Sequence, residues 1–376
     1  MSRTVLVIGG GVIGLATSYR LAQQGLSVQI VDASGSRGAS WAAAGMLAPV
    51  SEAIYGEEDL TRLNVSAVGE FVRLATELTS VTGLDVGLRH EGTLAVAFNS
   101  DDRAALVRLT EFRTSCGLIS KELNSSALRT LEPYLASEVR SGVLAVDDLS
   151  VDNRRYLAAL ARATELAGVS VHRSRVREIT ATGVRTDDGD LAADLIVLCA
   201  GALSGELADL PIQPVKGQIL RLHVPDRLNQ SGPVLSHTVR AIVRGGEIYL
   251  VPRADGEVVL GATSEQQGFD TTVTAGGVYE LLRNAYEVLP ISSEFEFVEA
   301  RAGSRPGTPD NAPILGRLSE RVIVASGHYR NGVLLSATTA EAVAALVSEQ
   351  SLAEEWRPFG PDRFHGRPIP AAQGRT

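Results

Sequence analysis

Cysteine and histidine are scarce in this chain of 376 residues, and neither is clustered. The two cysteines, Cys116 and Cys199, lie far apart, so the sequence predicts neither a disulfide framework nor a thiolate metal site. Cys199 falls inside the apolar run 195–200, which indicates a buried packing residue. The six histidines lack the spacing of metal ligands, and we expect no metal site.

Basic clusters and membrane-length segments are also missing. The formal net charge is −9 and no run of lysine or arginine occurs, which leaves nucleic-acid binding without electrostatic support. No stretch reaches the ~18 apolar residues of a membrane-spanning helix. Arg3 precedes an apolar run as in a signal peptide, but glycines at 9–11 interrupt that run too early. We expect a cytoplasmic protein with neither a nucleic-acid nor a membrane partner.

What the sequence does contain is a strong β-α-β pattern in residues 4–32. Five β-prone residues at 4–8 lead into glycines, helical spacing covers 12–24, and a second strand at 26–31 ends at Asp32. The glycines form the pattern G-x-G-x-x-G, in the order of elements that a dinucleotide-binding fingerprint requires. Without that context, the same glycines would indicate only a turn in some other α/β protein.

Each residue of the fingerprint has a physical role. Gly9 allows the turn out of the strand, Gly11 lets a pyrophosphate approach the backbone, and Gly14 lets the helix pack closely on the strand. The first helical turn presents free N–H groups and the positive end of the helix dipole to the phosphate. Asp32 can accept hydrogen bonds from both ribose hydroxyls and would repel a 2′-phosphate, which disfavours NADP. The motif alone does not separate NAD from FAD.

Small residues follow the fingerprint where a plain NAD-binding domain would continue with a helix and a strand. In the segment 34–46, Gly35, Gly38 and Gly45 interrupt helical continuity among alanines and serines. We interpret this segment as a loop whose backbone lies flush against a flat ligand, the alternative being the start of an alanine-rich helix. Residues 322–335 repeat the opening order of strand, glycine, short loop and helix. Both features disfavour an NAD-dependent dehydrogenase.

The middle of the chain predicts a second domain, because 376 residues suggest about two domains. Alternating segments at 218–223, 248–252 and 258–262, bounded by glycine turns, indicate antiparallel strands. A buried strand at 195–201 would return the chain to the first domain. Helical spacing covers 60–81, 101–116, 152–167 with Asp152 or Asn153 as N-cap, and 278–289. We therefore expect an α/β fold.

Seven short motifs extend along nearly the whole chain. They are residues 8–14 with Asp32, Ala-Ala-Ala-Gly-Met at 42–46, Pro-Val-Lys-Gly-Gln at 214–218, Tyr-Leu-Val-Pro-Arg at 249–253, Gly-Ala-Thr at 261–263, Arg-Pro-Gly-Thr at 305–308 and Gly-His-Tyr-Arg-Asn-Gly at 327–332. In this order they resemble the D-amino acid oxidase/sarcosine oxidase superfamily of FAD enzymes and, within it, the glycine oxidase family. The last two motifs are the most specific.

The resemblance implies a Rossmann-type FAD-binding domain and a second α+β substrate domain built on an antiparallel sheet. It places the FAD-binding domain at 1–86, 146–213 and 302–376, and the substrate-binding domain at 87–145 and 214–301. It implies non-covalent FAD, because the covalent sarcosine oxidases use a cysteine beyond position 199 and this chain has none there. The implied FAD contacts are Gly9, Gly11, Val12, Ile13, Gly14, Asp32, Ala33, Ala39, Ser40, Ala44, Gly45, Met46, Val176, His328, Tyr329, Arg330, Asn331, Gly332, Val333 and Leu334.

The resemblance also implies substrate contacts at Tyr249, Arg305 and Arg330. A planar guanidinium matches a substrate carboxylate bidentately, and we expect both arginines in glycine-rich loops that follow strands. The alternatives are a surface salt bridge for either arginine and a core aromatic for Tyr249. Glu247 and Ser264 depart from the family pattern, which has histidine and methionine there, so the shape or charge of the amine side would differ.

The implied activity is oxidative deamination of glycine, sarcosine and small D-amino acids, with hydride transfer from Cα to flavin N5. The products would be an imine or 2-oxo acid, ammonia and hydrogen peroxide, and the glycine imine would supply the thiazole ring of thiamine. The implied partners are a small amine, dioxygen and further copies of the chain, in a homo-oligomer such as a tetramer. The alternatives are a D-amino acid dehydrogenase with a non-oxygen acceptor and a catalytically silent flavoprotein.

Overall fold

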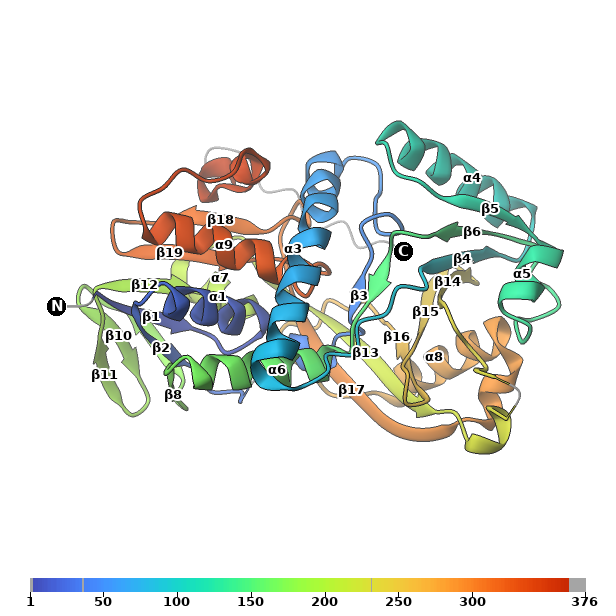
Figure 1. Ribbon diagram of the computed structural model, residues 1–376, viewed down its shortest axis with the longest axis horizontal. Coiled ribbons are helices and arrows are strands. Elements are labelled where there is room, and N and C mark those ends of the chain that lie inside the picture. Colours follow the sequence, from blue (N-terminus) through green and yellow to red (C-terminus); the bar gives the residue numbers. More distant parts are fainter. Residues whose placement is uncertain (1–2, 36, 231, 365–376) are drawn as a thin grey trace.

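The computed structural model describes residues 3–35, 37–230 and 232–364, and a mainly parallel sheet organises one half of the molecule (Figure 1). Its central strand β1 (Thr4–Ile8) pairs in parallel with β2 (Ser27–Val31) and with β12 (Leu195–Leu198). The full order is β18-β19-β12-β1-β2-β8. The strand β19 (Val322–Ser326) is parallel to β12, and β8 (Ser170–His172) is parallel to β2. The edge strand β18 (Ile314–Arg317) is antiparallel to β19.

Helices bury this sheet. Val5 and Val7 of β1 belong to one buried apolar cluster and Leu6 and Ile8 to another, as expected for a parallel strand that is covered on both faces. The helices on the first of these faces are α1 (Val12–Gln23), α3 (Glu58–Thr82), α6 (Asn153–Leu166) and α9 (Ser336–Val347), which pack against one another. None of the helices within residues 3–35, 37–230 and 232–364 has the length and apolar character to span a lipid bilayer.

A second, larger sheet forms the other half, in the order β17-β13-β16-β15-β14-β4-β6-β5. The expected antiparallel pairing is confirmed for every neighbouring pair except one, because β14 (Thr238–Val243) and β4 (Thr93–Ala97) are parallel. The helices α8 (Ala275–Val288) and α4 (Ser100–Ser115) pack on this sheet. Its other strands are β5 (Lys121–Asn124), β6 (Ser141–Ala145), β13 (Gln213–His223), β15 (Gly246–Pro252), β16 (Glu257–Gly261) and β17 (Glu296–Gly307).

The long antiparallel pair β13–β17 corrects one expectation from the sequence. Arg305 was expected in a glycine-rich loop, but it lies inside β17 and opposite Val215 of β13. The ladder continues through Gly217 and Gly303, which face each other, so pairing with β13 outweighs the tendency of glycine to end a strand. The domain boundaries predicted near residues 214 and 302 fall within these two strands, and they stay predictions.

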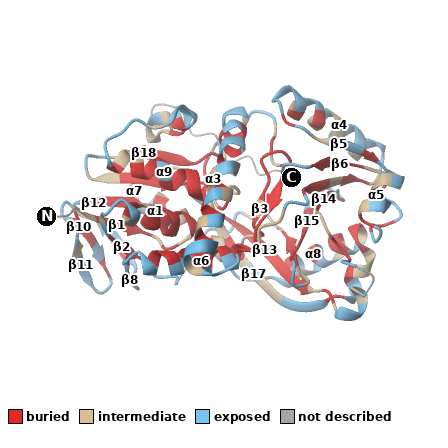
Figure 2. Ribbon diagram, in the orientation of Figure 1, coloured by how far each residue is buried: buried red, intermediate tan, exposed pale blue. Residues whose placement is uncertain are grey.

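Most other elements agree with the sequence pattern. Asp152 is the N-cap of α6 and accepts hydrogen bonds from the N–H groups of Arg154 and Arg155. The described residues of the segment 34–45 form a loop except for one helical turn, α2 (Ala39–Ala42), and the helix expected after the strand at 322–326 begins at Ser336. Cys199 is buried as predicted, and Figure 2 shows buried residues concentrated in the sheet interiors.

The remaining helices and strands are short. They are β3 (Met46–Leu47), β7 (Leu149–Ser150), α5 (Ser125–Leu131), α7 (Ser204–Ala208) and the small sheet of β9 (Val176–Ile179), β10 (Gly183–Thr186) and β11 (Gly189–Ala192).

Candidate active site

A cavity of about 2200 Å³ runs from the carboxyl ends of β1 and β12 to the large sheet. It brings together the residues that the sequence singled out: Tyr249, Arg305, Arg330, Glu247, Ser264 and all the predicted cofactor residues except two. Gly14 is one of the two residues that do not line the cavity. A Cβ on Gly14 would overlap the carbonyl oxygen of Gly9, so this glycine makes the close helix–strand contact predicted for it. Leu334 is the second residue that does not line the cavity, because it is 1% exposed and belongs to the apolar core.

The glycine turn and Asp32 form one end of this cavity. Gly9 has φ +106°, which favours glycine, and Gly11 is the N-cap of α1 without a side-chain cap of its own. The N–H of Val12 donates to Ser40 Oγ at 3.1 Å, and the N–H of Gly10 donates to Asp32 Oδ1 at 3.1 Å. The turn, the helix N-terminus and the acid therefore form one connected unit.

The loop beside the glycine turn is held by a buried amide. Asn153 Nδ2 donates to the carbonyl oxygens of Ser40 (2.8 Å) and Trp41 (3.0 Å). Asn153 Oδ1 accepts from Arg221 Nη2 at 3.0 Å, which fixes the direction of the amide. Arg221 is almost fully buried and pairs with Glu257, so the loop is tied to the large sheet.

Further along the same loop, Gly45 sits in a tight backbone contact. It has φ +73°, its carbonyl accepts from Val151 N at 2.8 Å, and a Cβ on it would overlap the Val151 carbonyl. The buried Arg253 donates to the carbonyl of Ala44. On the other side, a Cβ on Gly303 of β17 would lie 2.9 Å from Ala42 Cβ. The small residues predicted to face a ligand therefore also allow close packing against the strand ladder.

Arg305 reaches the other end of the cavity across a glycine. A Cβ on Gly217 would overlap its guanidinium group, so the glycine of the 214–218 motif makes room for this side chain. Arg305 Nη1 donates to the Thr263 carbonyl at 3.2 Å, and among the described residues no carboxylate pairs with it. Within the part of the chain that the structure describes, the charge of this cation is therefore left for a ligand.

Tyr249 lies next to this cation on the same sheet. It pairs with Arg240 on β14 and with Gly261 on β16, and a Cβ on Gly261 would overlap its hydroxyl. Burial raises the pKa of Tyr249, although Arg305 and Arg330 lower it in part. The phenol therefore stays protonated and can donate a hydrogen bond to an anion.

Two acids and two arginines form a charged cluster at the cavity wall, which we call the rim cluster: Glu52, Glu247, Arg240 and Arg330. Arg330 Nη1 lies 3.2 Å from Glu247 Oε2 and 3.9 Å from Glu52 Oε2, and Glu52 also pairs with Arg240. Burial alone would raise the pKa of Glu52, but Arg240 and Arg330 bring it below its usual value. Burial would lower the pKa of Arg330, but Glu52, Tyr329 and Glu247 together raise it above its usual value.

Sequence reasoning missed Glu52 and Arg240. Arg240 alternates with apolar residues on its strand, but only the register with Tyr249 shows that it faces the cavity. Glu52 carries no local signal, because it meets Arg240 across 188 residues of sequence.

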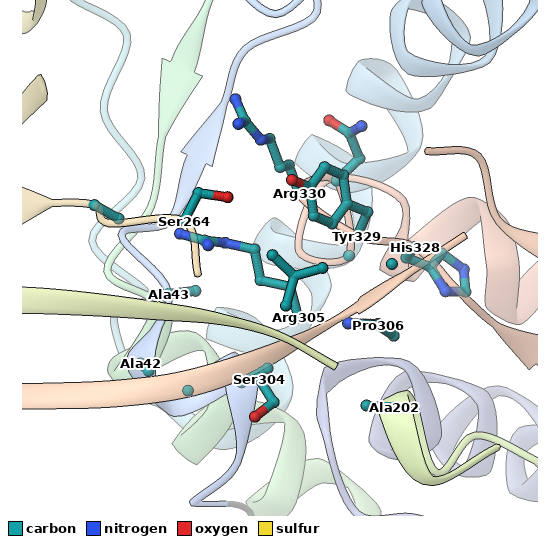
Figure 3. Close-up of a pocket in the computed structure, with 18 of the residues that line it drawn as sticks. Ala42, Ala43, Ala202, Ser264, Ser304, Arg305, Pro306, His328, Tyr329 and Arg330 are labelled. Atoms are coloured by element: carbon teal, nitrogen blue, oxygen red, sulfur yellow. The ribbon is translucent and has the colours of Figure 1, made fainter. Parts of the chain in front are cut away.

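Figure 3 shows how the predicted substrate residues are arranged. The side chains of Arg305 and Arg330 extend toward the same side of the pocket, on either side of Ser264, and His328 turns away from them. His328 Nε2 lies 3.0 Å from Thr339 Oγ1 of α9, and burial lowers the pKa of this histidine to about 3. His328 is therefore a neutral packing residue whose backbone borders the cavity.

The cavity fits an extended dinucleotide together with a small anion. An acid and a helix N-terminus lie at one end, and a tightly held loop of small residues forms a wall. At the other end lies Arg305, which no carboxylate of residues 3–35, 37–230 and 232–364 pairs with. Val176 borders the same end as Asp32, where the adenosine part of such a ligand would lie. These features agree with the FAD that the motifs imply.

Comparisons with known proteins give the same indication. Residues 4–346 match the DAO family, described as FAD dependent oxidoreductase. The chain is 34% identical to glycine oxidase of Geobacillus kaustophilus (strain HTA426), over 96% of this chain and 97% of that protein. A crystal structure of glycine oxidase from Geobacillus kaustophilus matches with a TM-score of 0.89 and 34% identity, over 97% of this chain and 100% of that one.

A second group of relatives is longer. The chain is 34% identical to the bifunctional protein ThiO/ThiG of Synechocystis sp. (strain ATCC 27184 / PCC 6803 / Kazusa) over 96% of this chain but 54% of that protein. The chain therefore spans about half the length of this relative.

We predict that Asn153→Asp weakens binding of FAD, the cofactor that the motifs imply, by about tenfold or more. A carboxylate would face the two carbonyl oxygens that the amide now binds, while keeping its contact with Arg221. The measurement is the dissociation constant of FAD for the apoprotein, by flavin fluorescence. Asn124→Asp at the N-cap of α5 is the matched control, and an equal loss in both variants would contradict the assignment.

We predict that His328 makes the protein sensitive to acid. Its folded pKa is depressed to about 3, so the unfolded chain binds a proton that the fold excludes, and stability falls as pH drops below the ordinary histidine value. The slope from this group is at most about 1.4 kcal/mol per pH unit between roughly pH 6.5 and 3. The free energy of unfolding, measured with urea over this pH range, should depend less on pH in His328→Gln than in the wild-type protein. The half-buried His223 gives the control His223→Gln, and the same flattening there would refute this cause.

Proposed function

The chain belongs to the DAO family of FAD-dependent oxidoreductases, and we propose that it oxidises glycine and other small amines, including sarcosine and small D-amino acids. The proposed products are an imine or, after hydrolysis, a 2-oxo acid with ammonia (methylamine in the case of sarcosine), together with hydrogen peroxide. The observation that supports this substrate class is Arg305, which has no carboxylate partner within the described residues, beside the protonated Tyr249. A small carboxylate is the ligand that such a pair would bind.

The chain's residues supply binding and orientation in this proposal. Arg305 would hold the substrate carboxylate through its planar guanidinium, and Tyr249 would donate a hydrogen bond to the same group. Fixing the carboxylate at two points fixes the position of the α-carbon. When bound, FAD supplies the electron acceptor, at N5, for a hydride from that carbon, and dioxygen then takes up the electrons. We assign no side-chain base, because an amine that binds in its neutral form needs none.

In this proposal, FAD would occupy the rest of the cavity. Asp32 would bind the ribose, the N-terminus of α1 the pyrophosphate, and Val176 the adenine side through its backbone. The small residues of the loop 39–46 and the backbone of 328–333 would border the flavin. Supply of the glycine imine to thiamine thiazole synthesis is part of the proposal and agrees with similarity to proteins named ThiO/ThiG.

We predict that anaerobic glycine bleaches the flavin spectrum of the purified protein, and that air restores it with release of hydrogen peroxide. Bleaching without recovery in air would instead identify a dehydrogenase with another acceptor. If glycine, sarcosine, D-alanine and D-proline all leave the oxidised spectrum unchanged, the proposed function is wrong.

We also predict that Arg305→Met lowers kcat/KM for glycine by about 100-fold, since a charge-assisted pair contributes up to about 3 kcal/mol. Gly217→Ala should give a loss of about tenfold, because a Cβ there displaces the guanidinium from its path. Gly276→Ala is the matched control, because a Cβ at that position meets nothing within 4 Å. Unchanged kcat/KM in Arg305→Met would remove this residue from the substrate site.

A further inference from the structure

At the substrate end of the cavity, Arg305 is an arginine that no carboxylate of the described residues pairs with. In the rim cluster, Glu52 and Glu247 balance Arg240 and Arg330. Arg305 stands apart, since its hydrogen bond goes to the Thr263 carbonyl and the described part of the chain gives it no acidic partner. A ligand with one carboxylate matches this charge, whereas a ligand with two leaves one carboxylate without a cation.

We propose that Glu247 is a specificity-determining residue that selects amines with one carboxylate over amines with two. By pairing with Arg330, Glu247 withholds the second guanidinium group of the site from the substrate. This inference rests on the proposed function, because it concerns the substrate of the same cavity.

The two acids of the rim cluster differ in a way that assigns this role to Glu247. The Glu52 side chain is 15% exposed and holds Arg240 and Arg330 together, so its loss would leave two arginines facing each other. The Glu247 side chain is 48% exposed and contacts Arg330 from the edge of the site. Removing the charge of Glu247 leaves the Glu52–Arg240 pair in place and leaves Arg330 with only its longer, 3.9 Å contact to Glu52 among the described acids, so that a ligand carboxylate can take the place of Glu247.

Arg305 and Arg330 both border the cavity and both act on the pKa of Tyr249, so they are the two cations that a dicarboxylate would meet there. Figure 3 shows Arg305 and Arg330 directed to one side of the pocket, with the short side chain of Ser264 between them. A second carboxylate on the amine substituent would meet Glu247 as well as Arg330 in the present chain. The two carboxylates would repel each other, and both would compete for the single guanidinium of Arg330.

Sarcosine and iminodiacetate are a matched pair of probes, because iminodiacetate is sarcosine with a carboxylate added to its N-methyl group. The experiment measures the anaerobic rate of flavin reduction by each amine in the wild-type holoenzyme and in Glu247→Gln. We expect the ratio of kred/Kd for iminodiacetate to that for sarcosine to rise by about tenfold or more in the variant. An unchanged or lower ratio overturns the proposal.

Two further variants separate a specific effect from a general change in charge. Glu280→Gln makes the same charge change at the same cavity, and a Cβ on Gly246, the residue before Glu247, would lie 3.4 Å from Glu280 Oε1. In the described part of the chain Glu280 is not paired with Arg330, so the ratio should stay at the wild-type value. In an Arg330→Gln background, Glu247→Gln should have no effect on the ratio. A rise in either case overturns the role of the Glu247–Arg330 pair.

A binding measurement keeps this inference distinct from the proposed oxidation. Calorimetry of the holoprotein with acetate and malonate gives two dissociation constants without any turnover. We expect the malonate constant to fall relative to the acetate constant by about tenfold in Glu247→Gln. That shift in a protein whose flavin no amine reduces would support the role of Glu247 and refute the oxidase. If sarcosine reduces the flavin normally but Glu247→Gln changes neither the kred/Kd ratio nor the ratio of dissociation constants, the oxidase is supported and the role of Glu247 is refuted.

Discussion

The pairing of β13 with β17 is the constraint on which the site depends. Along these two strands, Gly303 meets Ala42 of the loop beside the glycine turn, and Arg305 crosses Gly217 to reach the opposite, substrate end of the cavity. Glycines at both crossings allow the backbones to approach and leave space for one long side chain. The ladder therefore fixes where the substrate cation lies relative to the loop that borders the cofactor, and it does so with main-chain hydrogen bonds rather than with side-chain packing alone.

Electrostatic balance sets the chemical character of the cavity. Arg240 and the buried Arg221 pair with carboxylates, of Glu52 and Glu257 respectively, whereas the buried Arg253 donates to the carbonyl of Ala44. Breaking a buried ion pair by removing one partner costs roughly 3–5 kcal/mol, so the paired arginines depend on their acids. Arg305 also donates to a backbone carbonyl, but unlike Arg253 it borders the cavity, where its charge is available to a ligand.

Polar contacts behind the cofactor loop matter as much as the residues that border the cavity. Asn153 and Arg253 hold backbone carbonyls of the loop 38–46 from the side away from the cavity. The alanines and glycines of that loop have little side chain of their own, so their position depends on these donors. A loop of this kind combines close approach to a flat ligand with the rigidity that a binding site needs.

The sequence by itself determined the first β-α-β unit, the dinucleotide fingerprint, most helices and several of the motifs that border the cavity, because these follow from local periodicity and from motifs of a few residues. Tertiary structure alone decided that Arg305 belongs to a strand, that β14 and β4 run parallel, and that Asn153 holds the loop. It also decided the charge of the site. Glu52, Arg240 and Arg330 are far apart in the chain, and no local pattern specifies which acid meets which arginine. Long-range pairing of strands sets those distances, and therefore which cation is left for a substrate.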